Sequence, residues 1–136
     1  DVDVGLLQGG IGAGVDAEGL VSLGSFYHEP LWVFYRGGET IDQLVRLKGK
    51  RLAVGGEGSG TRRLALDLLE ASGVPQTDPG TKFLPVGGLE AVQALAQGKV
   101  DAVFLVGPAR SGAVWTAPVP VSVVTWSPRI SGTTRA

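Results

Sequence analysis

A short apolar segment, a glycine-rich loop and a helical segment follow one another between positions 50 and 73, and this succession constrains the fold most. The run KRLAV at 50–54 predicts a strand. The loop GEGSGTR occupies 56–62, and residues 61–72 place leucine and alanine at helical spacing before Gly73, a residue type that commonly follows a helix end. We therefore expect a strand, a loop and a helix in sequence, which is the unit of parallel α/β sheets.

Other segments extend this alternation and predict an α/β fold with a mostly parallel sheet flanked by helices. Within 31–35, Trp32 and Phe34 are expected on one face of a strand and Val33 and Tyr35 on the other, so these aromatic side chains are interpreted as core. The remaining expected elements are a strand at 1–7 before a glycine loop at 8–14, a helix at 40–47 with Thr40 as its N-cap, a strand at 82–86, a helix at 89–97, and strands at 100–106 and 118–126.

Composition narrows the functional classes. The 136 residues are enough for one domain or an incomplete pair, and 43% hydrophobic with 18% charged residues indicates a folded chain. The net charge is -1 with basic residues spread along the sequence, so no footprint for nucleic acid or an anionic membrane is visible. The chain has no cysteine, which excludes disulfides and thiolate metal sites, and its lack of methionine indicates processing or excision from a longer chain.

The glycine loop does not match the nucleotide-binding motifs. A Walker loop needs lysine directly after its last glycine, whereas Gly60 is followed by Thr61 and Arg62. The dinucleotide fingerprint needs G-x-G-x-x-G, whereas Gly56, Gly58 and Gly60 are spaced G-x-G-x-G. Both nucleotide interpretations are therefore rejected on spacing.

The loop retains the physics of an anion site. A helix start leaves N–H groups unpaired and carries partial positive charge, and Gly58 and Gly60 allow an anion to come close. Ser59 and Thr61 add hydroxyl donors, and Arg62 adds a bidentate partner for a carboxylate or phosphate. The alternative, that Ser59 or Thr61 only caps the helix and the glycines only permit a turn, stays open.

No catalytic apparatus accompanies the loop. The single histidine, His28, lies beside Pro30 and is interpreted as a surface or hinge residue, and no set of metal-ligating residues is present. We expect no cofactor, no metal and no enzymatic activity. Phe104, near the carboxyl end of its strand, is a candidate cleft residue because open α/β sheets bind ligands there. Arg36 is a further candidate anion partner, although surface solvation is the default for arginine.

Three sequence runs resemble the TAXI family of TRAP-transporter solute-binding proteins. They are YHEPLWV at 27–33, LKGKRLAVG at 47–55 and GSGT at 58–61. Two further runs, GLEAVQAL at 88–95 and GKVDA at 98–102, resemble the next helix and strand of that family. The similarity covers roughly residues 2–108, and the strand, loop and helix block is its most specific part.

The resemblance implies a two-lobed, periplasmic-binding-protein-like fold of the second type, with the ligand in the cleft between the lobes. It divides the chain into a partial first lobe and hinge strand at 1–40, a near-complete second lobe at 41–108, and a return segment and tail at 109–136. A half-cleft binds weakly because such ligands are enclosed from both sides. A second copy of the chain is one way to complete the partial lobe.

The resemblance also implies an exported, periplasmic or extracytoplasmic protein. It would capture a small carboxylate or amino acid, similar to glutamate or glutamine, and deliver it to the permease subunits of a TRAP transporter. Ser59, Gly60 and Thr61 would hold the carboxylate. The first lobe and hinge would contribute Gln8 and Gly9 to the cleft wall, and Tyr27 and Glu29 near the hinge, where Glu29 could pair with an amino group.

The sequence also admits two rival functions. One is an effector-binding regulatory domain of the same fold class, attached to a DNA-binding segment that this sequence does not contain. The other is a transferase that uses the loop to hold phosphate, which lacks a base, a metal site and a Walker lysine.

Overall fold

The computed structural model describes residues 3–6, 19, 21–24, 29–108 and 122–126. Within these ranges the chain forms a five-stranded sheet, two α-helices and one 3-10 helix. The elements, in chain order, are β1 (Leu31–Tyr35), η1 (Leu44–Leu47), β2 (Arg51–Ala53), α1 (Gly60–Ala71), β3 (Lys82–Leu84), α2 (Gly88–Ala96), β4 (Ala102–Val106) and β5 (Ser122–Trp126).

The sheet has the strand order β3-β2-β4-β1-β5 and is mixed. β2 pairs in parallel with β3 and β4, whereas β1 pairs antiparallel with both β4 and β5. The predicted α/β class with flanking helices is confirmed, and the sheet is mixed because β1 runs antiparallel to both of its neighbours. Only the segment from β2 to β4 alternates strands with crossover helices, and such crossovers are what make neighbouring strands parallel.

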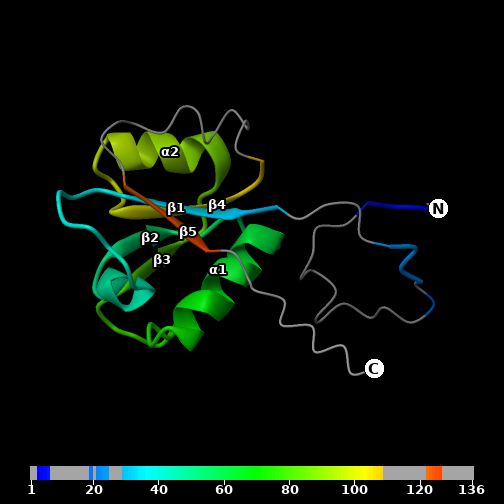
Figure 1. Cartoon of the computed structure of the whole chain (residues 1–136), viewed down its shortest axis with the longest axis horizontal. Helices are drawn as coiled ribbons and strands as arrows, with labels where there is room; N and C mark the ends of the chain where they lie inside the picture. The colour runs from blue at the N-terminus through cyan, green and yellow to red at the C-terminus, as the bar shows by residue number, and fades with distance from the viewer. Residues whose placement is uncertain (1–2, 7–18, 20, 25–28, 109–121, 127–136) are drawn as a thin grey trace, which may run out of the picture.

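The helices cover opposite faces of the sheet, with α2 above it and α1 below it in Figure 1. On the α1 side, Leu66 and Leu69 pack with Leu52 and Phe104. On the α2 side, Val92 and Leu95 pack against alternate strand residues, as strand geometry requires. Each helix therefore buries one apolar stripe, and the sheet between them is covered on both faces.

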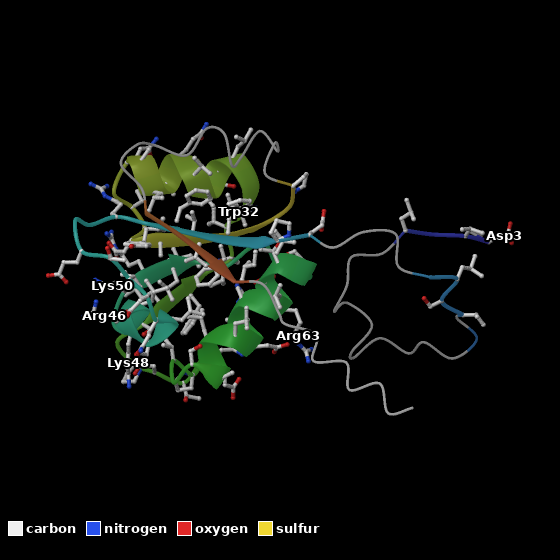
Figure 2. The ribbon with its side chains drawn as sticks, in the orientation of Figure 1. Asp3, Trp32, Arg46, Lys48, Lys50 and Arg63 are labelled. Carbon is white, nitrogen blue, oxygen red and sulfur yellow. The ribbon has the colours of Figure 1, made fainter. Side chains whose placement is uncertain are left out.

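Strand β1 shows the predicted alternation of faces. Val33 and Tyr35 belong to the α1-side core, whereas Phe34 belongs to the α2-side core with Trp32 packed against it. The rings of Trp32 and Phe34 are stacked with centroids 6.4 Å apart, and Figure 2 shows Trp32 between the sheet and α2. The interpretation of these aromatic residues as core is confirmed.

Two expected elements differ from the structure. The predicted helix at 40–47 is reduced to η1, whose N-cap position is Gln43 rather than Thr40. The chain before it is held by the tertiary structure instead, because the main-chain N–H of Ile41 donates to the hydroxyl of Tyr35 at 2.8 Å. Residues 3–6, expected in a strand, have no regular secondary structure. The glycine loop expected at 8–14 lies outside the described residues.

The two α-helices were predicted to within a residue or so at each end. Neither of them, in the part of the chain that the structure covers, has the length and apolar character needed to cross a bilayer.

Candidate functional site

The carboxyl ends of the parallel strands meet at one edge of the sheet, and the loop before α1 lies there. The chain leaves β2 through α1 to β3 on one side, then returns through α2 to β4 on the other side. The crossovers that follow the neighbouring strands β2 and β3 therefore run on opposite faces of the sheet. In open α/β sheets this divergence creates the crevice in which ligands bind.

The loop from Gly55 to Ser59 is shaped by two glycines in the left-handed region. Gly55 has φ of +101° and Gly58 has φ of +73°, values that residues with a side chain rarely adopt. At Gly55 the surroundings are also tight, because an added Cβ would lie 2.9 Å from the main-chain nitrogen of Arg62. Its N–H donates to the carbonyl of Val86 at 3.0 Å, which ties the loop to the end of the β3 segment.

Ser59 caps α1. It occupies the N-cap position, and its hydroxyl oxygen accepts from the N–H of Arg62 at 3.2 Å while the hydroxyl donates to the carbonyl of Gly56 at 2.7 Å. The capping alternative raised from the sequence thus holds for Ser59. The N–H groups of Gly60 and Thr61 have no hydrogen-bond acceptor within the described ranges; Gly60 is buried and Thr61 is half-buried.

Arg62 combines partial burial with an unpaired donor. Its Nη1 atom is buried, yet no partner for it exists among the described residues. Three and four residues further along α1, Ala65 and Leu66 are buried against the sheet, as is Leu69. Arg62 therefore begins the sheet-facing stripe of α1, at the end nearest the carboxyl ends of the strands. A buried guanidinium nitrogen without a partner is costly unless something binds it.

A second helix start lies against this loop. Gly87 is the N-cap of α2 and provides no side-chain cap. A Cβ at Gly87 would lie 3.2 Å from the main-chain nitrogen of Gly56 and 3.3 Å from the Cα of Gly55. Gly87 is not among the residues predicted for the site, although its glycine–helix pattern repeats that of the first loop. The two positive helix ends thus lie at the same edge of the sheet.

The other residues proposed from the sequence do not all lie here. Phe104 is fully buried in the α1-side core, so its side chain presents no surface to a ligand. Arg36 does not lie at this site. Its Nη1 donates to the carbonyl of Leu95 at 3.2 Å near the end of α2. Glu29 is half-buried just before β1. Gln8, Gly9, Tyr27 and His28 lie outside the described residues.

A separate hollow of about 350 Å³ lies near the other end of α1. It is mainly apolar and offers no cluster of donors. Its lining residues are Leu31, Val33, Asp42, Gln43, Leu44, Val45, Leu68 and Ser72. We place the anion site at the α1 start rather than in this hollow, because unpaired N–H groups occur at the former. No group of three or more metal-ligating side chains occurs in the described segments.

Comparison with known proteins identifies the family and supports the fold. The family model of the NMT1-like family matches residues 9–118, most of the sequence. The chain belongs to the NMT1-like family. As a member of this family it also has structural relatives among periplasmic binding proteins. One is the periplasmic aliphatic sulphonate binding protein SsuA from Escherichia coli, with 29% identity and a TM-score of 0.51 over 71% of this chain.

An ancestral arginine-binding protein bound to arginine is 25% identical over 72% of the chain, with a TM-score of 0.45. The NMT1-like chain spans 31% of the length of the sulphonate-binding protein and 41% of the arginine-binding protein. The expected periplasmic-binding-protein-like fold is confirmed for the part of that fold which this chain covers.

Proposed function

We propose that this chain is the ligand-binding part of an extracytoplasmic solute-binding protein and that it is not an enzyme. It captures a small solute through an anionic group held at the α1 start. The observation that carries this proposal is the buried Nη1 of Arg62, which has no partner in the described chain. Arg62 directly follows Gly60 and Thr61, whose N–H groups also lack an acceptor there.

The chemistry of these donors favours a compact anion with several oxygens. Two main-chain N–H groups, the hydroxyl of Thr61 and a guanidinium can together donate to a carboxylate or a sulphonate. The helix dipole adds a favourable interaction with negative charge. The similarity to a sulphonate-binding protein supports an anionic ligand without choosing between the two groups.

We further propose an amino acid or carboxylate as the solute and a TRAP-type transporter of the TAXI class as its recipient. The supporting observation is the exposed carboxylate of Glu57, which lies within the loop and can interact with an amino group on the ligand. The sequence runs at 27–33, 47–55 and 58–61 support the transporter class. The proposed cleft also includes Gln8 and Gly9 of the first lobe, and Tyr27 and Glu29 near the hinge.

Isothermal titration calorimetry on the folded chain tests the proposal directly. The panel contains glutamate, glutamine, arginine, succinate and ethanesulphonate, together with neutral and cationic analogues that lack the acid group. We expect heat from at least one acid and none from its analogue without the acid group. Equal binding of an acid and of its analogue without the acid group contradicts the proposal. So does the absence of binding by every acid in the panel, when the chain is folded and ligand-free.

Thermal unfolding gives an independent readout. A ligand that binds only the folded state stabilises it by roughly 2.7 kcal/mol at a concentration one hundred times its Kd. The melting temperature should therefore rise with the concentration of the binding acid and stay constant with the analogue that lacks the acid group.

A further inference from the structure

Basic side chains from three segments gather at the amino-terminal edge of the parallel strands. Arg46 belongs to η1, Lys48 and Lys50 lie in the turn before β2, and Lys82 opens β3; all four are exposed. We call these four residues the basic edge. Figure 2 shows Arg46, Lys48 and Lys50 at one corner of the molecule. The N–H of Lys82 donates to the carbonyl of Lys50 at 3.0 Å, which brings the fourth residue beside them.

Arg46, Lys48 and Lys50 are close together in the sequence, and the sheet adds Lys82 from a distant segment. The parallel register aligns Arg51 of β2 with Lys82 of β3. Since parallel strands start at the same edge of a sheet, the basic residues at their starts become neighbours. The expectation that basic residues are dispersed is therefore wrong for this edge.

Neighbouring carboxylates neutralise only part of this charge. Lys48 lies 3.4 Å from Asp78, and the exposed Asp42 lies just before η1. Asp101 interacts electrostatically with Lys50 but is paired with Arg51 at 2.7 Å. Within the described chain, Lys50 and Lys82 have no carboxylate oxygen within 4 Å. The basic edge thus keeps an excess of positive charge that faces solvent.

We propose that the basic edge binds a bilayer surface that carries anionic phospholipid headgroups. Clusters of lysine and arginine near such a surface are attracted to it, and each residue strengthens binding roughly fivefold at moderate ionic strength. Lysine predominates in the cluster, and lysine is depleted in protein–protein interfaces. Its compact charge on a flexible stem suits mobile headgroups better than a fixed protein surface.

The position of the basic edge is compatible with ligand binding. It lies at the amino ends of β2 and β3, whereas the loop at 55–59 follows the carboxyl end of β2. A chain that lies on a bilayer through this edge keeps the α1 start accessible from solution. Val45, which is 40% exposed beside Arg46, adds an apolar contact with the interfacial region.

Vesicle co-sedimentation tests this proposal with matched variants of the whole chain. Vesicles of phosphatidylglycerol and phosphatidylcholine are compared with vesicles of phosphatidylcholine alone, at low and at high salt. Lys50→Glu changes the basic edge, while Arg63→Glu makes the same change of charge near the start of α1, where Figure 2 shows Arg63 away from that corner. Circular dichroism confirms that both variants remain folded.

We expect binding to the anionic vesicles only, with loss at high salt because salt screens the attraction. Lys50→Glu should lower the partition coefficient about tenfold or more, since it removes one positive charge and adds one negative charge, while Arg63→Glu should change it much less. Equal losses in the two variants, or no binding to anionic vesicles at low salt, overturn the proposal. If the chain is retained on immobilised polyglutamate but does not bind vesicles, the basic edge would be assigned to an acidic protein partner, and the proposal would also be overturned.

Discussion

Arg51 donates three hydrogen bonds to the carboxylate of Asp101: Nε to Oδ2 at 3.0 Å, Nη2 to Oδ1 at 2.7 Å and the main-chain N–H to Oδ2 at 2.9 Å. In return, the N–H of Asp101 donates to the carbonyl of Arg51 at 2.8 Å. This pair joins the amino ends of β2 and β4 and fixes their parallel register.

The first prediction concerns pH. The hydrogen bonds from Arg51 lower the pKa of Asp101, although partial burial acts in the opposite direction. A carboxyl whose pKa is lowered by folding contributes to the free energy of unfolding above its unfolded pKa of about 4. This contribution is lost as the pH falls through the folded pKa. Asp101→Asn should therefore reduce the free energy of unfolding at pH 6, and the difference from the wild type should shrink toward pH 3.

Urea denaturation at several pH values measures this difference. Asp67→Asn is the matched control, because Asp67 forms only an exposed pair with Arg63 at 3.0 Å on α1. The control should show little difference from the wild type at any pH. A constant difference for Asp101→Asn from pH 6 to pH 3 would show that the pair does not act through the ionised carboxylate.

The second prediction concerns the glycine loop. Gly55→Ala combines a positive φ with a Cβ 2.9 Å from a main-chain nitrogen and should lower the free energy of unfolding by about 2–4 kcal/mol. Gly58→Ala meets open space and should cost only the left-handed conformation, roughly 1–2 kcal/mol. Gly56→Ala has neither defect and should stay within about 0.5 kcal/mol. Chemical denaturation of the three variants checks the order, and any other order contradicts the described geometry.

The third prediction concerns Arg62. Arg62→Gln removes a charged donor from the proposed anion site, and hydrogen bonds to charged groups contribute about 1.5–3 kcal/mol. Affinity for the acid identified by calorimetry should fall tenfold or more. The ligand-free chain should not be destabilised, because the substitution removes a buried nitrogen that lacks a partner. A variant that loses stability but keeps full affinity would assign Arg62 to the fold and move the ligand elsewhere.

The fourth prediction separates the two hydroxyls. Ser59→Ala removes the N-cap of α1 and should cost about 0.5–2 kcal/mol of stability. Thr61→Ala removes a hydroxyl that has no described partner, so stability should stay within about 0.5 kcal/mol while ligand affinity falls. Melting curves and calorimetry on both variants distinguish these effects. Equal affinity in Thr61→Ala and the wild type would exclude its hydroxyl from the site.

The fifth prediction concerns Phe104, which the sequence suggested as a cleft residue. Because the side chain is fully buried, Phe104→Leu leaves a cavity in the core and should lower the free energy of unfolding, by less than the roughly 3–5 kcal/mol typical of Phe→Ala. Ligand affinity should be unchanged once the folded fraction is taken into account. A large loss of affinity in a folded variant would contradict the position of Phe104 in the core.

The strand, loop and helix block was predictable because its signals are local. The glycines, the cap at Ser59 and the helical spacing of the leucines all act within a few residues of one another. The directions of β1 and β5 were not predictable in the same way. Their β-branched and aromatic residues suit a strand in either direction, and the direction depends on how distant segments connect.

The candidate site also combines features that local sequence predicts with features that depend on distant segments. The helical position of Arg62 follows from its spacing to Leu66 and Leu69, but the burial of its Nη1 depends on the surrounding tertiary structure. The contact between Gly87 and the first loop depends on where two crossover helices begin along the edge of the sheet. Likewise, the proximity of Lys50 and Lys82 follows from strand register, which no local pattern in the sequence specifies.

The pairing of β1 with β5 has a practical consequence. Leu31, the first residue of β1, is the register partner of Trp126, the last residue of β5. The two ends of the segment 31–126 therefore emerge side by side. Segments with adjacent ends tolerate transfer into a surface loop of a host protein. This one is thus suited to use as an insertable cassette, for example between the halves of a fluorescent reporter.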